Sequence, residues 1–137
     1  MDELVGWLGE QLDADAVRAM EAADEVGASW RYDDGQVLAD REGDMVATGS
    51  QDFLEAERGR FIAEHDPAQV LREIDAKQKT INLHAPQVAP FSHTQKGCTA
   101  CSDNARSEWG ADWPCLTLRL LAAPYAARPG YREEWRP

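Results

Sequence analysis

Apolar side chains recur at helical spacing over roughly the first 25 residues. They fall on one face of a helix and are Leu4, Val5, Leu8, Leu12, Val17 and Met20. Asp2 precedes this stripe and suits a helix N-cap, and Glu3 favours the positive end of the helix dipole. We therefore predict an amphipathic helix over residues 2–25. Its stripe is expected to dock on the protein's own core, and pairing in a homodimer is the alternative.

Short β-prone runs replace the helical period after Gly27. They cover residues 29–32, 36–39 and 45–48, separated by Asp33-Asp34-Gly35 and Arg41-Glu42-Gly43-Asp44. An Asp-Gly pair between two such runs favours a tight hairpin, so we predict a small antiparallel meander. Trp30 and Tyr32 share one face and are expected to pack against a helix. The many carboxylates between residues 33 and 44 disfavour a nucleic-acid stacking platform.

Helical spacing returns over residues 51–84 and is broken at Asp66-Pro67. Because the residue before proline disfavours the α conformation, two helices should meet at a corner here. Asp66 suits the N-cap of the second helix, Pro67 its first position, and Gln69 the third position of a capping box. Ser50 can cap the first helix. The expected buried side chains are Phe53, Leu54, Phe61 and Ile62, then Val70, Leu71, Ile74 and Ile81.

Residues 85–114 show no apolar period and are punctuated by proline and glycine. An irregular stretch of this length inside a compact domain needs something to fix it. Residues 115–123 predict a short helix. A tail follows this helix, and we expect its Tyr131 and Trp135 side chains to dock on the body of the protein. An exposed tail that binds a partner is the alternative. The predicted fold class is α+β.

All three cysteines lie in the last third of the chain, as Cys98, Cys101 and Cys115, with His84 upstream. The spacing is H-x13-C-x2-C-x13-C. Three thiolates and one imidazole complete the tetrahedron of a structural zinc site. His84 ends a predicted helix, which would fix its imidazole, whereas His93 lies nearer to Cys98 on a loop. We favour His84 as the fourth ligand and keep His93 as the alternative.

Two other interpretations of the cysteines are weaker. A redox CxxC usually opens a helix after a strand, whereas Cys98 follows a polar loop over residues 92–97. A disulfide with one spare thiol is disfavoured by the odd cysteine count and by an N-terminus without the basic region of a secretory signal. Structural zinc is therefore the expected cofactor.

Length and net charge limit the number of domains and the kinds of partner that we expect. The chain has 137 residues and predicts a single domain, with an acidic part over 1–83 and a C-terminal part over 84–137 held by zinc. The net charge is −11, and residues 1–66 hold 18 acidic against 5 basic side chains. This balance disfavours direct contact with nucleic acid. No apolar run approaches the ~18 residues of a membrane span, so we expect a cytoplasmic protein.

Two segments resemble a known family. Residues 61–74, with His65-Asp66-Pro67-Ala68 and Val70-Leu71-Arg72-Glu73, are similar to its central helix pair. Trp113-Pro114-Cys115, Thr117–Ala122, Pro124-Tyr125 and Gly130–Trp135 resemble its C-terminal signature. The family is an uncharacterised "domain of unknown function" family of actinobacteria and their phages. The resemblance spans nearly the whole chain and implies the ligand set His84, Cys98, Cys101 and Cys115. It implies no activity.

The expected function is that of a small acidic cytosolic zinc-binding protein without enzymatic activity, which serves as a protein-interaction or accessory factor for an unidentified protein partner. The alternative is a nucleic-acid-related module, either a DNA mimic or a binder of a DNA-binding protein; direct contact would use Lys96, Arg106 and Arg119. A metal-dependent hydrolase or deaminase is disfavoured, because Glu108 is the only nearby acid and the deaminase motifs are missing around Cys98.

Overall fold

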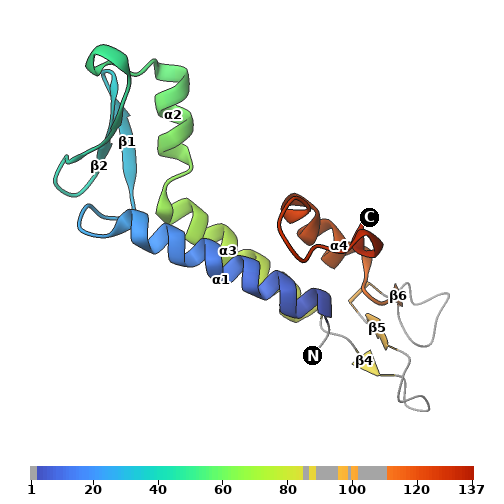
Figure 1. Cartoon of the computed structure of the whole chain (residues 1–137). Helices are drawn as coiled ribbons and strands as arrows, with labels where there is room; N and C mark the ends of the chain where they lie inside the picture. The colour runs from blue at the N-terminus through green and yellow to red at the C-terminus, as the bar shows by residue number, and fades with distance from the viewer. Residues whose placement is uncertain (1–2, 85–86, 89–95, 99, 102–110) are drawn as a thin grey trace. The chain divides into compact units, whose positions relative to one another are not determined.

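The computed structural model describes residues 3–84, 87–88, 96–98, 100–101 and 111–137 (Figure 1). The chain is α+β, as predicted: an N-terminal helix, a three-stranded antiparallel sheet, further helices, a cysteine cluster and a short C-terminal helix. It forms two compact units. Residues 13–75 make up the meander unit, and residues 1–12 with 76–137 make up the terminal unit. The predicted division between residues 83 and 84 stays a prediction.

The helices are α1 (Glu3–Ala23), α2 (Ala56–Glu64), α3 (Pro67–Leu83) and α4 (Leu116–Ala122). The strands are β1 (Trp30–Asp33), β2 (Gln36–Ala39), β3 (Met45–Thr48), β4 (Gln87–Val88), β5 (Lys96–Cys98) and β6 (Ala111–Asp112). Short 3-10 turns cover Ser50–Asp52, Ala123–Tyr125 and Glu133–Trp135. None of the described helices is long and apolar enough to cross a membrane.

The predicted meander is confirmed. β1, β2 and β3 pair antiparallel in sequence order, with Trp30 opposite Ala39 and Asp33 opposite Gln36. The first hairpin turns at Asp34 and Gly35, whose φ angles of 35° and 89° are both positive. Such a turn suits the right-handed twist of the paired strands, which is why an Asp-Gly pair marks it in the sequence.

Helix α2 packs against this sheet, beside β1 in Figure 1. The contact is close because Gly59 faces the Tyr32 ring, and a Cβ at Gly59 would overlap that ring. The Tyr32 hydroxyl donates a hydrogen bond to the Leu54 carbonyl at 2.8 Å and accepts one from the Gly35 N–H at 3.0 Å. The expectation that these sheet aromatics pack on a helix is therefore confirmed for Tyr32.

The corner between α2 and α3 is built as predicted. Pro67 is the first residue of α3, and the carboxylate of Asp66 accepts a hydrogen bond from the Gln69 N–H at 2.8 Å. Its second oxygen accepts one from the Trp30 N–H at 2.9 Å. Asp66 is buried, so the helix cap also fixes the start of β1.

The start of the first of these two helices was predicted wrongly. Ser50 does not begin an α-helix at Gln51; it opens a 3-10 turn, and α2 begins at Ala56. Gln51 and Asp52 have positive φ angles of 60° and 59°, which an α-helix does not allow. Apolar spacing alone carries no information about such a backbone break.

Several side chains expected in the core are exposed instead. Phe53 and Phe61 are 47% and 63% exposed, while α2 buries the small residues Gly59 and Ala63. The reason is steric, since the face of α2 that meets the sheet has to admit the Tyr32 ring. On α1, Val17 and Met20 are likewise exposed, and the buried position is Ala19.

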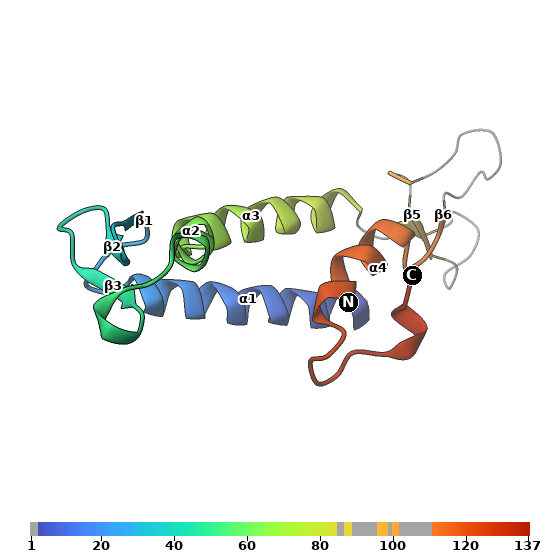
Figure 2. The ribbon, with the colours of Figure 1, turned by 90° about the horizontal axis from the view of Figure 1, so that it is seen from above.

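In the terminal unit, the segments of α1 and α3 lie side by side in both views (Figures 1 and 2). α1 buries Leu4, Leu8 and Leu12, and α3 buries Ile81. The N-terminal half of the predicted apolar stripe therefore packs in the protein's own core, as expected.

Within the terminal unit, the C-terminal tail docks against α1, as predicted. Trp7, Tyr131 and Trp135 form an aromatic cluster with ring centroids 5.4–5.8 Å apart, and Trp135 is only 4% exposed. The Trp7 indole N–H donates a hydrogen bond to the Pro129 carbonyl at 3.0 Å. Offset and edge-on ring pairs of this kind add to the free energy gained by burial.

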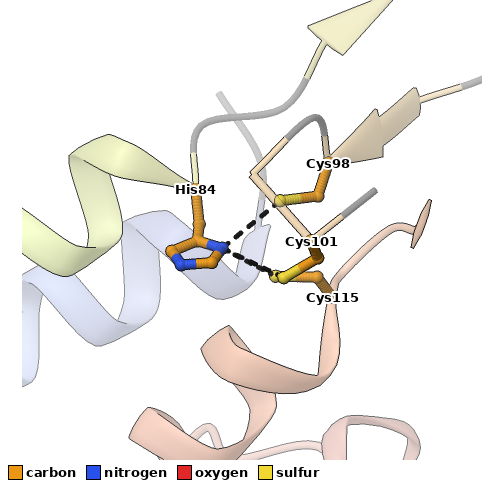
Figure 3. A group of neighbouring side chains, drawn as sticks. All are labelled: His84, Cys98, Cys101 and Cys115. Carbon is orange, nitrogen blue, oxygen red and sulfur yellow. Dashed lines mark hydrogen bonds between the residues drawn. The ribbon is translucent and has the colours of Figure 1, made fainter. Parts of the chain in front are cut away.

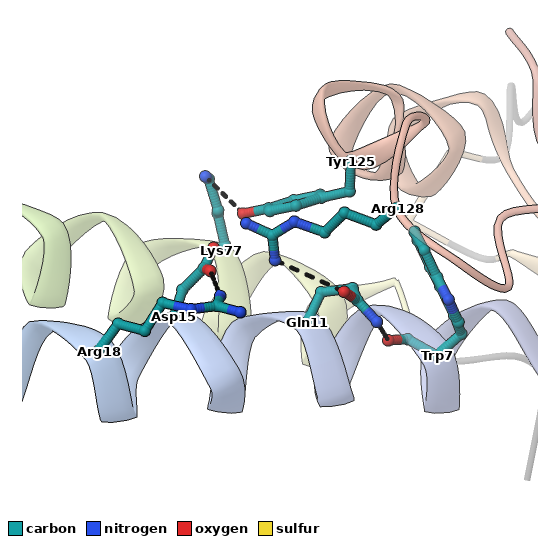
Figure 4. Close-up of polar contacts among 7 residues, drawn as sticks. All are labelled: Trp7, Gln11, Asp15, Arg18, Lys77, Tyr125 and Arg128. Carbon is teal, nitrogen blue, oxygen red and sulfur yellow. Dashed lines mark hydrogen bonds and ion pairs between the residues drawn. The ribbon is translucent and has the colours of Figure 1, made fainter.

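A second anchor surrounds Tyr125 (Figure 4). The Arg128 guanidinium lies 4.7 Å from the centre of the Tyr125 ring, and Lys77 donates a hydrogen bond to its hydroxyl at 3.0 Å. Arg128 also donates to the Gln11 side chain at 3.5 Å. The segment after α4 is therefore tied to both α1 and α3 within this unit.

A small sheet lies in the stretch that was predicted to be irregular. β4 pairs with β5, and β5 pairs with β6, all antiparallel. The rest of the predicted loop over residues 85–114 lies mostly outside the described residues. Strands of two or three residues are too short to show an alternating pattern, so the sequence could not reveal them.

Candidate metal centre

Four side chains from separate parts of the terminal unit converge on one point (Figure 3). They are His84, Cys98, Cys101 and Cys115, and their ligand atoms all lie within 4.8 Å of one another. His84 directly follows α3. Its backbone N–H bonds to the carbonyls of Thr80 and Ile81, both at 3.1 Å, so the last turn of the helix holds the imidazole in place.

Pairing of β5 with β6 brings the cysteines together. Cys98 is the last residue of β5 and lies opposite Ala111 of β6. After β6, a cis Trp113-Pro114 bond leads to Cys115, which is the N-cap of α4. Cys101 lies in a turn close behind Cys98. Each sulfur is thus held by a different local structure: a strand end, a turn and a helix start.

The distances fit four ligands around one small cation. The Nδ1 atom of His84 lies 3.3 Å from the sulfur of Cys98, 3.2 Å from that of Cys101 and 3.6 Å from that of Cys115. Tetrahedral zinc, with bonds of about 2.0–2.1 Å to nitrogen and about 2.3 Å to sulfur, places nitrogen and sulfur roughly 3.5 Å apart. All three cysteines are among the described residues, and none is in a disulfide.

The centre is shielded from water. Cys98 and Cys115 are fully buried, His84 is 9% exposed and Cys101 is half-buried. Burial raises the pKa of the Cys115 thiol to about 12, although a hydrogen bond from the backbone N–H of Leu118 acts to lower it. A thiol in this setting releases its proton readily only when a cation takes the proton's place.

Cys101 differs from the two buried cysteines. Its burial acts to raise the pKa, but hydrogen bonds with Thr117 and with the other two cysteines outweigh that effect, and its pKa lies below the ordinary value. The Thr117 hydroxyl is 3.5 Å from the Cys101 sulfur. A hydroxyl that hydrogen-bonds a thiolate orients it and stabilises its charge.

A protein-family model described as a family of unknown function (DUF6221) matches residues 1–137. The chain belongs to this family. The predicted membership in a family of unknown function is therefore confirmed. No curated protein and no solved structure matches this DUF6221 chain. Membership in DUF6221 assigns no activity to the centre.

The structure brings together the favoured set of four predicted ligands, which can hold a metal ion. The alternative ligand His93 lies outside the described residues, as do Glu108 and Arg106. His65 lies in the meander unit, where it is the C-cap of α2. The assignment of the four residues as ligands stays a prediction.

Sequence analysis missed Thr117. It lies in the first turn of α4, two residues after Cys115. The available signal was weak, since a threonine near a helix start is common and shows no sign of pointing toward a sulfur. Only the pairing of β5 with β6 places Cys101 within reach of its hydroxyl.

Proposed function

We propose that this protein binds one zinc ion through His84, Cys98, Cys101 and Cys115, and that the ion has a structural role. The observation that carries the proposal is the convergence of four buried or half-buried donor atoms with spacing that suits tetrahedral zinc. Three sulfurs and one imidazole are soft to intermediate donors, which favours zinc over magnesium or calcium.

The role is structural because the ligand set is closed. Catalytic zinc usually has three protein ligands and keeps one position for water or substrate. Here four protein donors occupy the whole tetrahedron. We therefore propose a protein without enzymatic activity at this centre.

Short elements around the centre support the need for an ion. β4 and β6 have two residues each, β5 has three and α4 has seven. Strands and helices of this length are not stable alone in water. A cation that binds only the folded chain contributes its binding free energy to folding. Zinc would thus hold β5, β6, α4 and the end of α3 together.

The folded surface, rather than the ion, would then perform the function, and we propose that it binds another protein. Zinc–thiolate coordination requires reduced cysteines, which suits the cytoplasm.

The test is the zinc content of the purified chain and of matched histidine variants. The wild type should hold one equivalent of zinc by mass spectrometry of the metal. His84→Ala should lose it, whereas His65→Ala, in the meander unit, should keep it. His93→Ala forms the third arm and should also keep zinc.

Removal of the ion provides the second readout. A strong chelator should lower the thermal unfolding temperature of the wild type, and added zinc should restore it. Retention of zinc by His84→Ala together with its loss in His93→Ala would reassign the fourth ligand. A fully folded wild type that takes up no zinc would overturn the proposal.

A further inference from the structure

The two units divide the charge of the chain unequally. The meander unit holds 17 acidic and 6 basic side chains, whereas the terminal unit holds 8 of each. The whole net charge of −11 therefore belongs to residues 13–75. All of the acidic side chains in the meander unit are exposed except Asp15, which is half-buried, and Asp66, which is buried. Such a surface attracts a basic partner and repels nucleic acid.

A cavity of about 330 Å³ opens in this same unit. It lies where α1, β1 and the α2–α3 corner meet, and most of its wall is apolar. The lining side chains include Ala19, Ala22, Trp30, Pro67 and Val70. Its volume is at the lower end of the range of small-ligand sites, roughly 300–1,000 Å³, and is sufficient for one large apolar side chain.

The walls of the cavity are fixed before anything binds. Trp30 is held through its backbone by Asp66 and through its indole N–H by the Gly27 carbonyl at 3.0 Å. The His65 ring stacks on Phe61, with centroids 4.3 Å apart, and its Nδ1 lies 2.7 Å from the Phe61 carbonyl. A site that is already ordered loses little entropy on binding.

The polar residues at this cavity do not make it an anion site. Arg18 is paired with Asp15 at 2.8 Å, so its charge is balanced locally. The Nδ1–H of His65 is directed at the Phe61 carbonyl. Beside the cavity, Trp30 also lines a second one of about 220 Å³ together with Tyr32, Arg60, Ala63 and Glu64. Trp30 thus lines both cavities.

We propose that the meander unit docks a basic segment of a partner protein, which inserts one large apolar side chain against Trp30 and places lysines or arginines over exposed carboxylates of the same unit. The apolar cavity provides selectivity, and the charge of the unit provides attraction. A second copy of this chain fits less well, because its terminal unit has no net charge and its meander unit is acidic.

This inference rests on the proposed role as an interaction protein but not on zinc, since no residue of the cavity belongs to the ligand set. Loss of zinc in the ligand variants and loss of peptide binding in the variants below are therefore separate results.

The test compares two fluorescent peptides on the full-length protein by anisotropy. Both consist of lysines around one central residue, which is leucine in one peptide and serine in the other. Burial of the leucine side chain should make the first bind at least about tenfold more tightly. Both affinities should fall as salt screens the lysines. Equal affinities would overturn the proposal, because charge alone would then account for binding.

Two substitutions on α1 locate the contact. Ala22→Leu fills the cavity from an exposed helix position. The affinity for the leucine peptide should then fall to that for the serine peptide. Val17→Leu, which also enlarges an exposed side chain of α1 but lies outside the cavity lining, should leave the leucine preference intact. A preference that survives Ala22→Leu would contradict the site. Sedimentation showing a dimer that Ala22→Leu disrupts would instead assign the cavity to a second copy.

Discussion

The Asp66 carboxylate accepts the backbone N–H of Trp30 across 36 positions of the sequence, at 2.9 Å. The same carboxylate caps α3 through the Gln69 N–H. One buried side chain therefore fixes both the start of a strand and the start of a helix. This arrangement sets the position of Trp30, which lines the cavity of the meander unit.

Replacement of Asp66 by alanine should destabilise the protein by about 1–3 kcal/mol. The substitution removes a helix cap and leaves the Trp30 N–H without its acceptor. Asp66→Asn should be intermediate, because an amide oxygen can cap the helix while the amide nitrogen cannot accept the second hydrogen bond. Urea unfolding followed by circular dichroism measures the difference. Equal stability of Asp66→Ala and wild type would contradict this account of the corner.

The docked tail leads to a second prediction. Trp135→Ala should lower the free energy of unfolding by about 3–5 kcal/mol, since it empties a buried position between Trp7 and Tyr131. Leu120→Ala is the control, because Leu120 is 55% exposed and its loss should change stability by no more than about 0.5 kcal/mol. The two variants are compared by chemical denaturation. Similar values for both would mean that the tail does not contribute to the core.

Thr117 should tune zinc affinity without being a ligand. Thr117→Val keeps the shape of the side chain but removes the hydroxyl that contacts Cys101, and affinity should fall by about tenfold. Thr117→Ser retains a hydroxyl and should restore most of the loss. Competition with a coloured chelator gives both values. An unchanged affinity in Thr117→Val would show that the hydrogen bond has no influence on the metal.

Zinc affinity should also depend on pH. Because burial raises the pKa of the Cys115 thiol to about 12, this thiol has to lose a proton when zinc binds at any pH below that value. Its contribution alone weakens binding by about tenfold for each pH unit of acidification. The Cys101 thiol, with its lowered pKa, contributes less at alkaline pH. A pH-indicator dye should record at least about one proton released per zinc bound, and release of none would contradict the protonated state of Cys115.

The grouping of His84 with the cysteines was accessible from sequence for a specific reason. Cysteine is rare in this chain, and the short gap between Cys98 and Cys101 restricts both sulfurs to one turn. The corner at Asp66-Pro67 could also be predicted from the sequence, because a helix cap and the fixed φ angle of proline act locally. The hairpin at Asp34-Gly35 belongs to the same class, since its positive φ angles depend on these residues alone.

The errors share a different cause. Phe61 was assigned to the core from its spacing, but the packing face of α2 is chosen by the Tyr32 ring, which requires Gly59. The pairing of β5 with β6 joins segments too short to carry a pattern, and Thr117 reaches Cys101 only because of that pairing. Contacts between segments far apart in the sequence decided each of these features.

X-ray absorption at the zinc edge tests the central claim most directly. The account predicts one zinc per chain with three sulfurs at about 2.3 Å and one nitrogen at about 2.0–2.1 Å. In a sample with Cys115→Ser, one sulfur should be lost from that shell. A shell dominated by oxygen or nitrogen, or one with sulfur from fewer than three cysteines in the wild type, would contradict the proposed centre.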